Sequence, residues 1–111
     1  MQLMDEQEFR DRSSSTLDDL SHRLASASDR HAFESDFNSG ALAIEFDDPP
    51  AKFVVSPNSP VRQIWVSAHS KSFKLDWDWS RGEFVLAASG QTLVDLIAQA
   101  IGQQLGETVT L

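Results

Sequence analysis

The stretch Val61-Arg62-Gln63-Ile64-Trp65-Val66-Ser67 decides the fold, because from Gln63 on its aliphatic residues alternate with the others. This alternation is typical of a β-strand with one buried face. Ile64 and Val66 then share one face, and Gln63, Trp65 and Ser67 share the other. If helices cover the aliphatic side, Trp65 stands on the open side of the sheet, where an indole is a candidate contact anchor. The reverse register, with Trp65 in the core, is the alternative that periodicity leaves open.

Other segments on both sides of this strand have the same period of two. Asn38-Ser39-Gly40 separates the first two of them as a turn, and Asp47-Asp48-Pro49-Pro50 breaks the chain before the third. We expect loops at residues 56–60 and 78–82. The predicted strands cover residues 33–37, 42–46, 52–55, 62–67, 73–77 and 83–86.

Helical spacing replaces strand spacing at both ends of the chain. The first helix is predicted to begin at Asp5, with Glu8 completing a capping box, and to fade near residues 26–28. The second begins at Thr92, with Asp95 at the capping-box position, and ends at Gly106. Each has one apolar face, made by Phe9, Thr16, Leu17, Leu20 and Leu24 in the first and by Leu93, Leu96, Ile97, Ala100, Ile101 and Leu105 in the second.

This order of elements predicts an α+β fold, a two-layer α/β sandwich. The N- and C-terminal helices pack on one face of an antiparallel sheet of about five or six strands, and the other face stays in water. A chain of 111 residues is the usual size of one domain, so residues 1–111 are expected to form a single domain.

Charge is distributed unevenly along the chain. Residues 1–48 contain twelve Asp or Glu against four Arg, whereas residues 49–111 contain five of each sign. An acidic face of this kind suits a cation or a basic protein and disfavours nucleic acid and anionic membranes as partners. A merely solubilising surface is the alternative. With no cysteine, no apolar run of spanning length and an acidic N-terminus without a leader pattern, we expect a cytoplasmic protein.

No catalytic motif is found in the sequence. The serines lie in no G-x-S-x-G elbow, the five glycines form no phosphate-binding loop, and His22, His31 and His69 are isolated. The carboxylates Asp11, Asp18 and Asp19 of the first helix could approach Glu34 and Asp36 of the first strand. Exposed oxygen ligands of this kind suit Fe, Mn, Ca or Mg at low affinity.

Several motifs resemble the frataxin family. Pro60-x-x-Gln63-Ile64-Trp65, with Ser67 and then Leu75-Asp76-Trp77, is similar to the central signature of frataxins. The ending Gly106-Glu107-Thr108-Val109-Thr110-Leu111 resembles the bacterial, CyaY-type iron donor branch. The similarity runs from about residue 8 to residue 111, with a short insertion near residues 78–81.

The resemblance implies the same sandwich, and it implies weak iron binding on an acidic ridge of the first helix and first strand. It also implies a role as an adaptor or regulator of iron–sulfur cluster assembly, with a cysteine desulfurase and a scaffold protein as partners. The sheet face that carries Trp65 is then an interaction surface, with Arg62, Gln63 and Trp65 as partner-binding residues. The iron is Fe²⁺ or Fe³⁺, and its candidate ligands are Asp11, Asp18, Asp19, His22, Glu34 and Asp36.

Two alternatives to the iron-binding adaptor are left open. One is a metal-independent acidic protein that binds and regulates the same machinery. The other is a slow ferroxidase, which ranks last because no carboxylate–histidine site is evident, so we expect no enzyme. We further expect a monomer that can oligomerise with iron.

Overall fold

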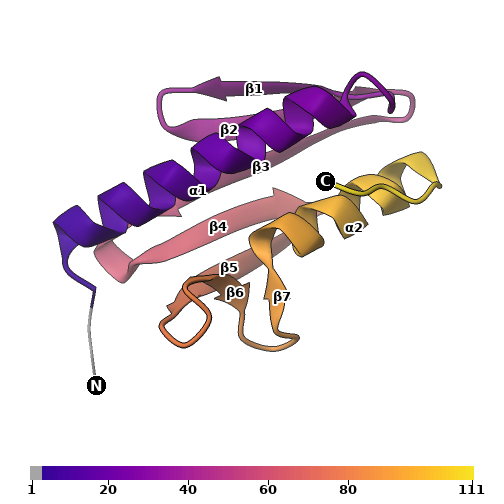
Figure 1. Cartoon of the computed structure of the whole chain (residues 1–111). Helices are drawn as coiled ribbons and strands as arrows, with labels where there is room; N and C mark the ends of the chain where they lie inside the picture. The colour runs from indigo at the N-terminus through magenta and orange to yellow at the C-terminus, as the bar shows by residue number, and fades with distance from the viewer. Residues whose placement is uncertain (1–3) are drawn as a thin grey trace.

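The computed structural model describes residues 4–111 and consists of two layers, a seven-stranded antiparallel sheet and two helices (Figure 1). Both helices lie on the same face of the sheet, as the sequence predicts. The strands follow one another across the sheet in chain order, each paired with the next. The elements are α1 (Glu6–Ala27), β1 (Glu34–Asn38), β2 (Ala41–Asp47), β3 (Pro50–Asn58), the 3₁₀ turn η1 (Ser59–Val61), β4 (Gln63–Ala68), β5 (Lys71–Asp78), β6 (Glu83–Leu86), β7 (Gln91–Thr92) and α2 (Leu93–Leu105).

Helix ends lie where the capping residues predict. The Asp5 carboxylate accepts a 2.7 Å hydrogen bond from the backbone N–H of Glu8, and the Thr92 hydroxyl accepts one of 3.2 Å from that of Asp95. Gly106 ends α2 in the left-handed conformation, at φ 70°. Neither helix of residues 4–111 has the length and apolar composition needed to span a bilayer.

The core lies between the helices and the covered face of the sheet. Phe9 of α1 packs edge-on against Phe84 of β6, with ring centroids 5.9 Å apart, and Phe46 and Phe53 meet at 4.9 Å. Ile64 and Val66 of β4 are buried in the same layer. The predicted core residues are all buried, which confirms the docking of both helices: Phe9, Leu17, Leu20, Leu24, Leu96, Ile97 and Ile101.

The sheet is larger than the five or six strands that the sequence predicts. Strand β3 continues through Ser56, Pro57 and Asn58, which were expected to form a loop, because these residues pair with β4. Strand β5 begins at Lys71 because a tight turn, with His69 and Ser70 both at positive φ, returns the chain at once. The two-residue strand β7 was not expected and pairs with β6.

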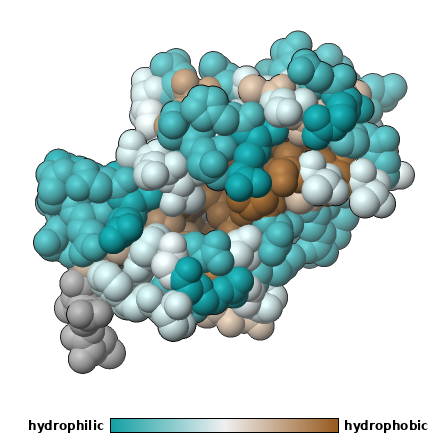
Figure 2. Space-filling model, viewed as in Figure 1, coloured by the Kyte–Doolittle hydropathy of each residue, from teal (hydrophilic) through white to brown (hydrophobic). Residues whose placement is uncertain are grey.

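A short C-terminal segment follows α2 and packs back over the core. Figure 2 shows an apolar strip between the two helices. Val109 is buried, and the Arg23 guanidinium of α1 donates a 3.3 Å hydrogen bond to the backbone oxygen of Leu111. The turn that begins this segment is held by the Gly102 carbonyl, which accepts the backbone N–H groups of Gly106 and Glu107 at 2.8 and 3.1 Å.

Gly102 is required by this close approach. A Cβ at Gly102 would lie 2.8 Å from the carbonyl oxygen of Glu107. We therefore expect Gly102→Ala to destabilise the fold by about 1–3 kcal/mol, although Ala in a helix is ordinarily about 1 kcal/mol better than Gly. Denaturant unfolding measures the difference. The matched control Ala98→Gly, one turn earlier, should lose about 1 kcal/mol from propensity alone; a gain of stability in Gly102→Ala would contradict the packing described here.

Leu20 tests the docking of α1 on the sheet. Its side chain is fully buried, so Leu20→Ala should cost about 2–5 kcal/mol of unfolding free energy through lost contacts and a residual cavity. Chemical denaturation followed by circular dichroism measures this loss. A loss of less than about 0.5 kcal/mol, the usual range for surface substitutions, would mean that α1 docks by a different face.

Candidate functional site

Trp65 lies on the open face of the sheet, as the alternation of β4 predicts. Its side chain is 37% exposed, whereas Ile64 and Val66 beside it are buried. The indole N–H donates a 3.0 Å hydrogen bond to Gln63 Oε1, and Gln63 Nε2 donates one of 3.0 Å to Asp76 Oδ1. On the other side, Lys74 Nζ lies 4.9 Å from the indole ring centroid. The ring is therefore fixed in orientation while part of its surface stays in water.

Small side chains surround Trp65 on the same face. In the register of the sheet, Ser56 lies opposite Trp65, and the neighbouring row runs through Ala43, Val54 and Ser67. Since residues two apart on a strand share a face, these short side chains lie around the indole and project less than it does. An aromatic ring that projects from a surface of small residues has the form of an interface anchor.

Arg62 lies apart from this surface, although the sequence grouped it with Trp65 on one strand. It precedes β4 in the left-handed conformation, at φ 55°. Its Nε donates a 3.1 Å hydrogen bond to the Met4 carbonyl, and its Nη1 donates to the Ser59 carbonyl. These bonds tie the start of the described chain to η1, and the guanidinium does not flank the indole.

The acidic residues of α1 are exposed and engaged with their own helix. Asp11 accepts a 3.0 Å hydrogen bond from Gln7, and Asp19 forms a 2.8 Å ion pair with Arg23. His22 Nδ1 lies 3.7 Å from Asp18 Oδ2. Each contact spans four residues along the helix, where side chains are neighbours on one face.

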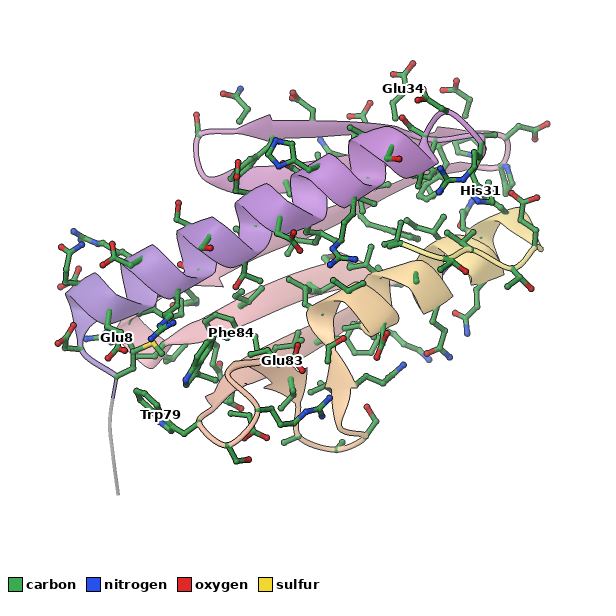
Figure 3. All side chains as sticks on the ribbon, in the orientation of Figure 1. Glu8, His31, Glu34, Trp79, Glu83 and Phe84 are labelled. Atoms are coloured by element: carbon green, nitrogen blue, oxygen red, sulfur yellow. The ribbon has the colours of Figure 1, made fainter. Side chains whose placement is uncertain are left out.

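Glu34 and Asp36 point away from α1. They lie on the edge strand β1, where Glu34 is opposite Glu45 and Asp36 is opposite Ala43. The intervening Ser35 is opposite the buried Ile44, so strand alternation sends the two carboxylates to the open face. Figure 3 shows Glu34 at the far end of the molecule from Glu8 at the start of α1.

The six candidate iron ligands are therefore not gathered into one site. Within residues 4–111, no three His, Cys, Asp or Glu side chains lie close enough to hold a metal ion together. Asp18 with His22 is the one candidate pair in contact. Scattered, exposed carboxylates of this kind suit weak and exchangeable cation binding, because water competes for each ligand position.

The turn between β5 and β6 carries a feature that strand periodicity does not reveal. Asp78 Oδ1 accepts hydrogen bonds from Ser80 N, Ser80 Oγ and Arg81 N at 2.9, 2.7 and 3.2 Å. The Ser80 hydroxyl bond, with the backbone bonds, lowers the pKa of Asp78. Between these residues Trp79 is 44% exposed, and it stands beside a groove of about 440 Å³ at the end of the molecule where α1 begins. The Asp-x-Ser turn was the available sequence signal.

The comparisons with known proteins agree on one family. The frataxin-like domain model matches residues 2–107. The iron–sulfur cluster assembly protein CyaY of Azotobacter vinelandii is 29% identical over 93 residues, which are 82% of this chain and 84% of that protein. CyaY of Tolumonas auensis is 30% identical over 78 residues, 70% of this chain and 72% of that protein.

A solved structure gives the same result for the fold. Frataxin from Psychromonas ingrahamii superposes with a TM-score of 0.82 over 96% of this chain and 97% of that chain, at 20% sequence identity. This likeness confirms the architecture, and the match of the domain model over nearly the whole sequence shows the family. The chain belongs to the frataxin family.

Proposed function

We propose that this protein is an adaptor of iron–sulfur cluster assembly that docks on a cysteine desulfurase and scaffold through the Trp65 face. The observation that carries the proposal is an indole fixed by Gln63 and Lys74 yet 37% exposed on the uncovered face of the sheet. The CyaY relatives, whose names describe cluster assembly proteins, supply the class of partner. The role is that of a binding protein and not of an enzyme.

Docking at this face is supported by the ordered Trp65 ring, which the stability of the fold does not require. Trp65 covers no part of the core, so fixing its ring adds little to stability. Aromatic residues at the centre of an interface can contribute 2 kcal/mol or more to binding. The acidic N-terminal half adds a long-range attraction to a basic partner surface, and this attraction raises the association rate more than the final affinity.

Iron enters this proposal as a weakly held cargo. Exposed carboxylates on α1 and β1 can each bind a hydrated iron ion, with low affinity because water competes for every ligand position. The dispersal of Asp11, Asp18, Asp19, His22, Glu34 and Asp36 also favours the second candidate, a regulator whose docking needs no metal. The two candidates share the docking surface and differ only in saturable iron binding.

Trp65→Ala tests the docking surface. We expect binding to a purified bacterial desulfurase–scaffold complex to weaken at least about tenfold, equal to about 1.4 kcal/mol, because the anchor is lost. The melting temperature should change by less than about 4 °C, which corresponds to under about 1 kcal/mol. Calorimetric titration and thermal melts measure the two quantities.

Trp77→Ala is the matched control for Trp65→Ala. Trp77 lies on the covered side of the next strand, 5.1 Å from the Phe84 ring, so its loss should lower the melting temperature. If instead Trp65→Ala unfolds the protein, or leaves the affinity for the complex unchanged, docking through this face is ruled out.

Replacing Asp18, Asp19, Glu34 and Asp36 together by their amides separates the two candidates. For an iron-binding adaptor, the variant should lose the saturable heat of anaerobic Fe(II) titration and keep the native circular dichroism. Fewer like charges in the acidic half should leave stability unchanged or raise it. No saturable heat in the unmodified chain would favour the metal-independent regulator, and an unchanged titration in the variant would remove these four residues from any iron site.

A further inference from the structure

We propose that the groove beside Trp79 is a second docking site, which binds a Lys or Arg side chain presented by a partner protein. In this arrangement the cationic head lies against the Trp79 ring and the aliphatic stem lies in the groove. The groove is lined by Met4, Pro60, Val61, Arg62, Asp76, Trp77 and Trp79.

The three tryptophans of the chain differ in whether a cation lies over the ring. Arg12 lies over the Trp77 ring, 5.2 Å from its centroid, and Lys74 lies over Trp65 at 4.9 Å. Trp79 is the most exposed of the three, and no cation from residues 4–111 lies over its ring. The attraction between an indole face and a cation is strongest for tryptophan, so the uncovered ring is a site for a cation from outside.

Trp79 is already held in place by its turn and by Trp77. The Asp78 carboxylate ties down the backbone of Ser80 and Arg81, and the Gly82 N–H donates a 2.8 Å hydrogen bond to the Asp78 carbonyl. The Trp79 ring meets Trp77 edge-on, with centroids 6.2 Å apart and planes at 82°. In a perpendicular pair at most one face of the Trp79 indole lies against Trp77, so this contact leaves the other face available. A fixed ring also loses little conformational entropy when a ligand binds.

The lining of the groove combines apolar side chains with a carboxylate. Met4 and Val61 give the groove apolar walls, with Val61 itself 50% exposed. Asp76 lies in the groove, and the Asp78 carboxylate lies in the adjoining turn. The one cation in the lining, Arg62, already donates to the carbonyls of Met4 and Ser59. Apolar walls beside carboxylates match a side chain with an aliphatic stem and a cationic head.

Charge also selects the kind of partner. The chain has a net charge of −8, so a second copy of it would approach against like-charge repulsion. A basic partner surface is attracted by the same field. The groove is linked to the proposed Trp65 docking surface through Asp76, which accepts the Gln63 hydrogen bond; only the identity of the partner rests on the proposed function.

The test uses the full chain labelled with ¹⁵N and the peptide acetyl-Leu-Arg-Leu-amide. Trp65, Trp77 and Trp79 give three indole N–H signals that single Phe variants assign. We expect the Trp79 signal to shift saturably with a Kd of about 1 mM. The peptide with citrulline in place of arginine has the same shape and no charge, and should bind about threefold or more weakly.

Three variants make the result specific. Trp79→Ala should abolish the saturable shift of the remaining signals, and Trp79→Leu, which keeps an apolar side chain beside the carboxylates, should reduce the preference for the arginine peptide over the citrulline peptide. Trp65→Ala should leave arginine binding unchanged. Thermal melts check that each variant is folded.

The proposal fails if the Trp79 signal does not move or if Trp79→Ala binds as tightly as the unmodified chain. Equal binding of the arginine and citrulline peptides also overturns it, because the groove would then be a merely apolar site. Failure of docking on the desulfurase–scaffold complex, with arginine binding at Trp79 intact, would overturn the proposed function and leave this inference standing.

Discussion

Burial of one face of the sheet under α1 and α2 is the constraint on which the other features depend. Each strand must turn its aliphatic residues toward the helices, as Ile64 and Val66 do in β4. Since alternate residues point to opposite faces, this burial also fixes what the open face displays. Trp65 is exposed because its neighbours Ile64 and Val66 belong to the core. Glu34 and Asp36 lie on the same open face because Ser35, between them, is opposite the buried Ile44.

The same constraint separates the acidic residues into two groups. Helix α1 covers one face of the sheet, and its outer side carries Asp11, Asp18 and Asp19. The carboxylates of β1 point to the other face, across the thickness of the sheet. Local pairs such as Asp19 with Arg23 reduce the charge on α1 further. The acidic half of the chain therefore presents a spread of negative charge, and within residues 4–111 its carboxylates form no group of three that could hold one metal ion.

Both helices, the two layers and six of the seven strands could be predicted from periodicity and capping residues, because burial and hydrogen-bond satisfaction act locally at those positions. The residues at the end of β3 and at the start of β5 could not be predicted as strand in this way. Pro57 has no N–H and reads as a loop residue, yet pairing with β4 keeps it in β3. The turn at His69 and Ser70 contains no glycine, although both residues adopt positive φ, so the start of β5 was missed.

The site residues were likewise predictable where local alternation places them and not where tertiary packing does. Trp65 lies on a strand, where alternation assigns its face. The spatial relation between α1 and the edge strand depends on tertiary packing, and the sequence placed their carboxylates together when the structure separates them. Trp79 lies in a turn, where side chains follow no regular alternation from which their exposure could be predicted. Its surroundings include Met4 and Val61, which are far from it in sequence and come together only in the folded chain.

The order of strands in the sheet has a consequence for how the chain is made. Every strand pairs with the one synthesised just before it, so the sheet can grow hairpin by hairpin as the chain leaves the ribosome. Helix α1 precedes every strand of the sheet in the chain, yet Phe9 packs against Phe84, near the end of the sheet. The part of its apolar face around Phe9 therefore stays uncovered until β6 has been made, and a nascent chain that stops within β5 still exposes this apolar surface to aggregation.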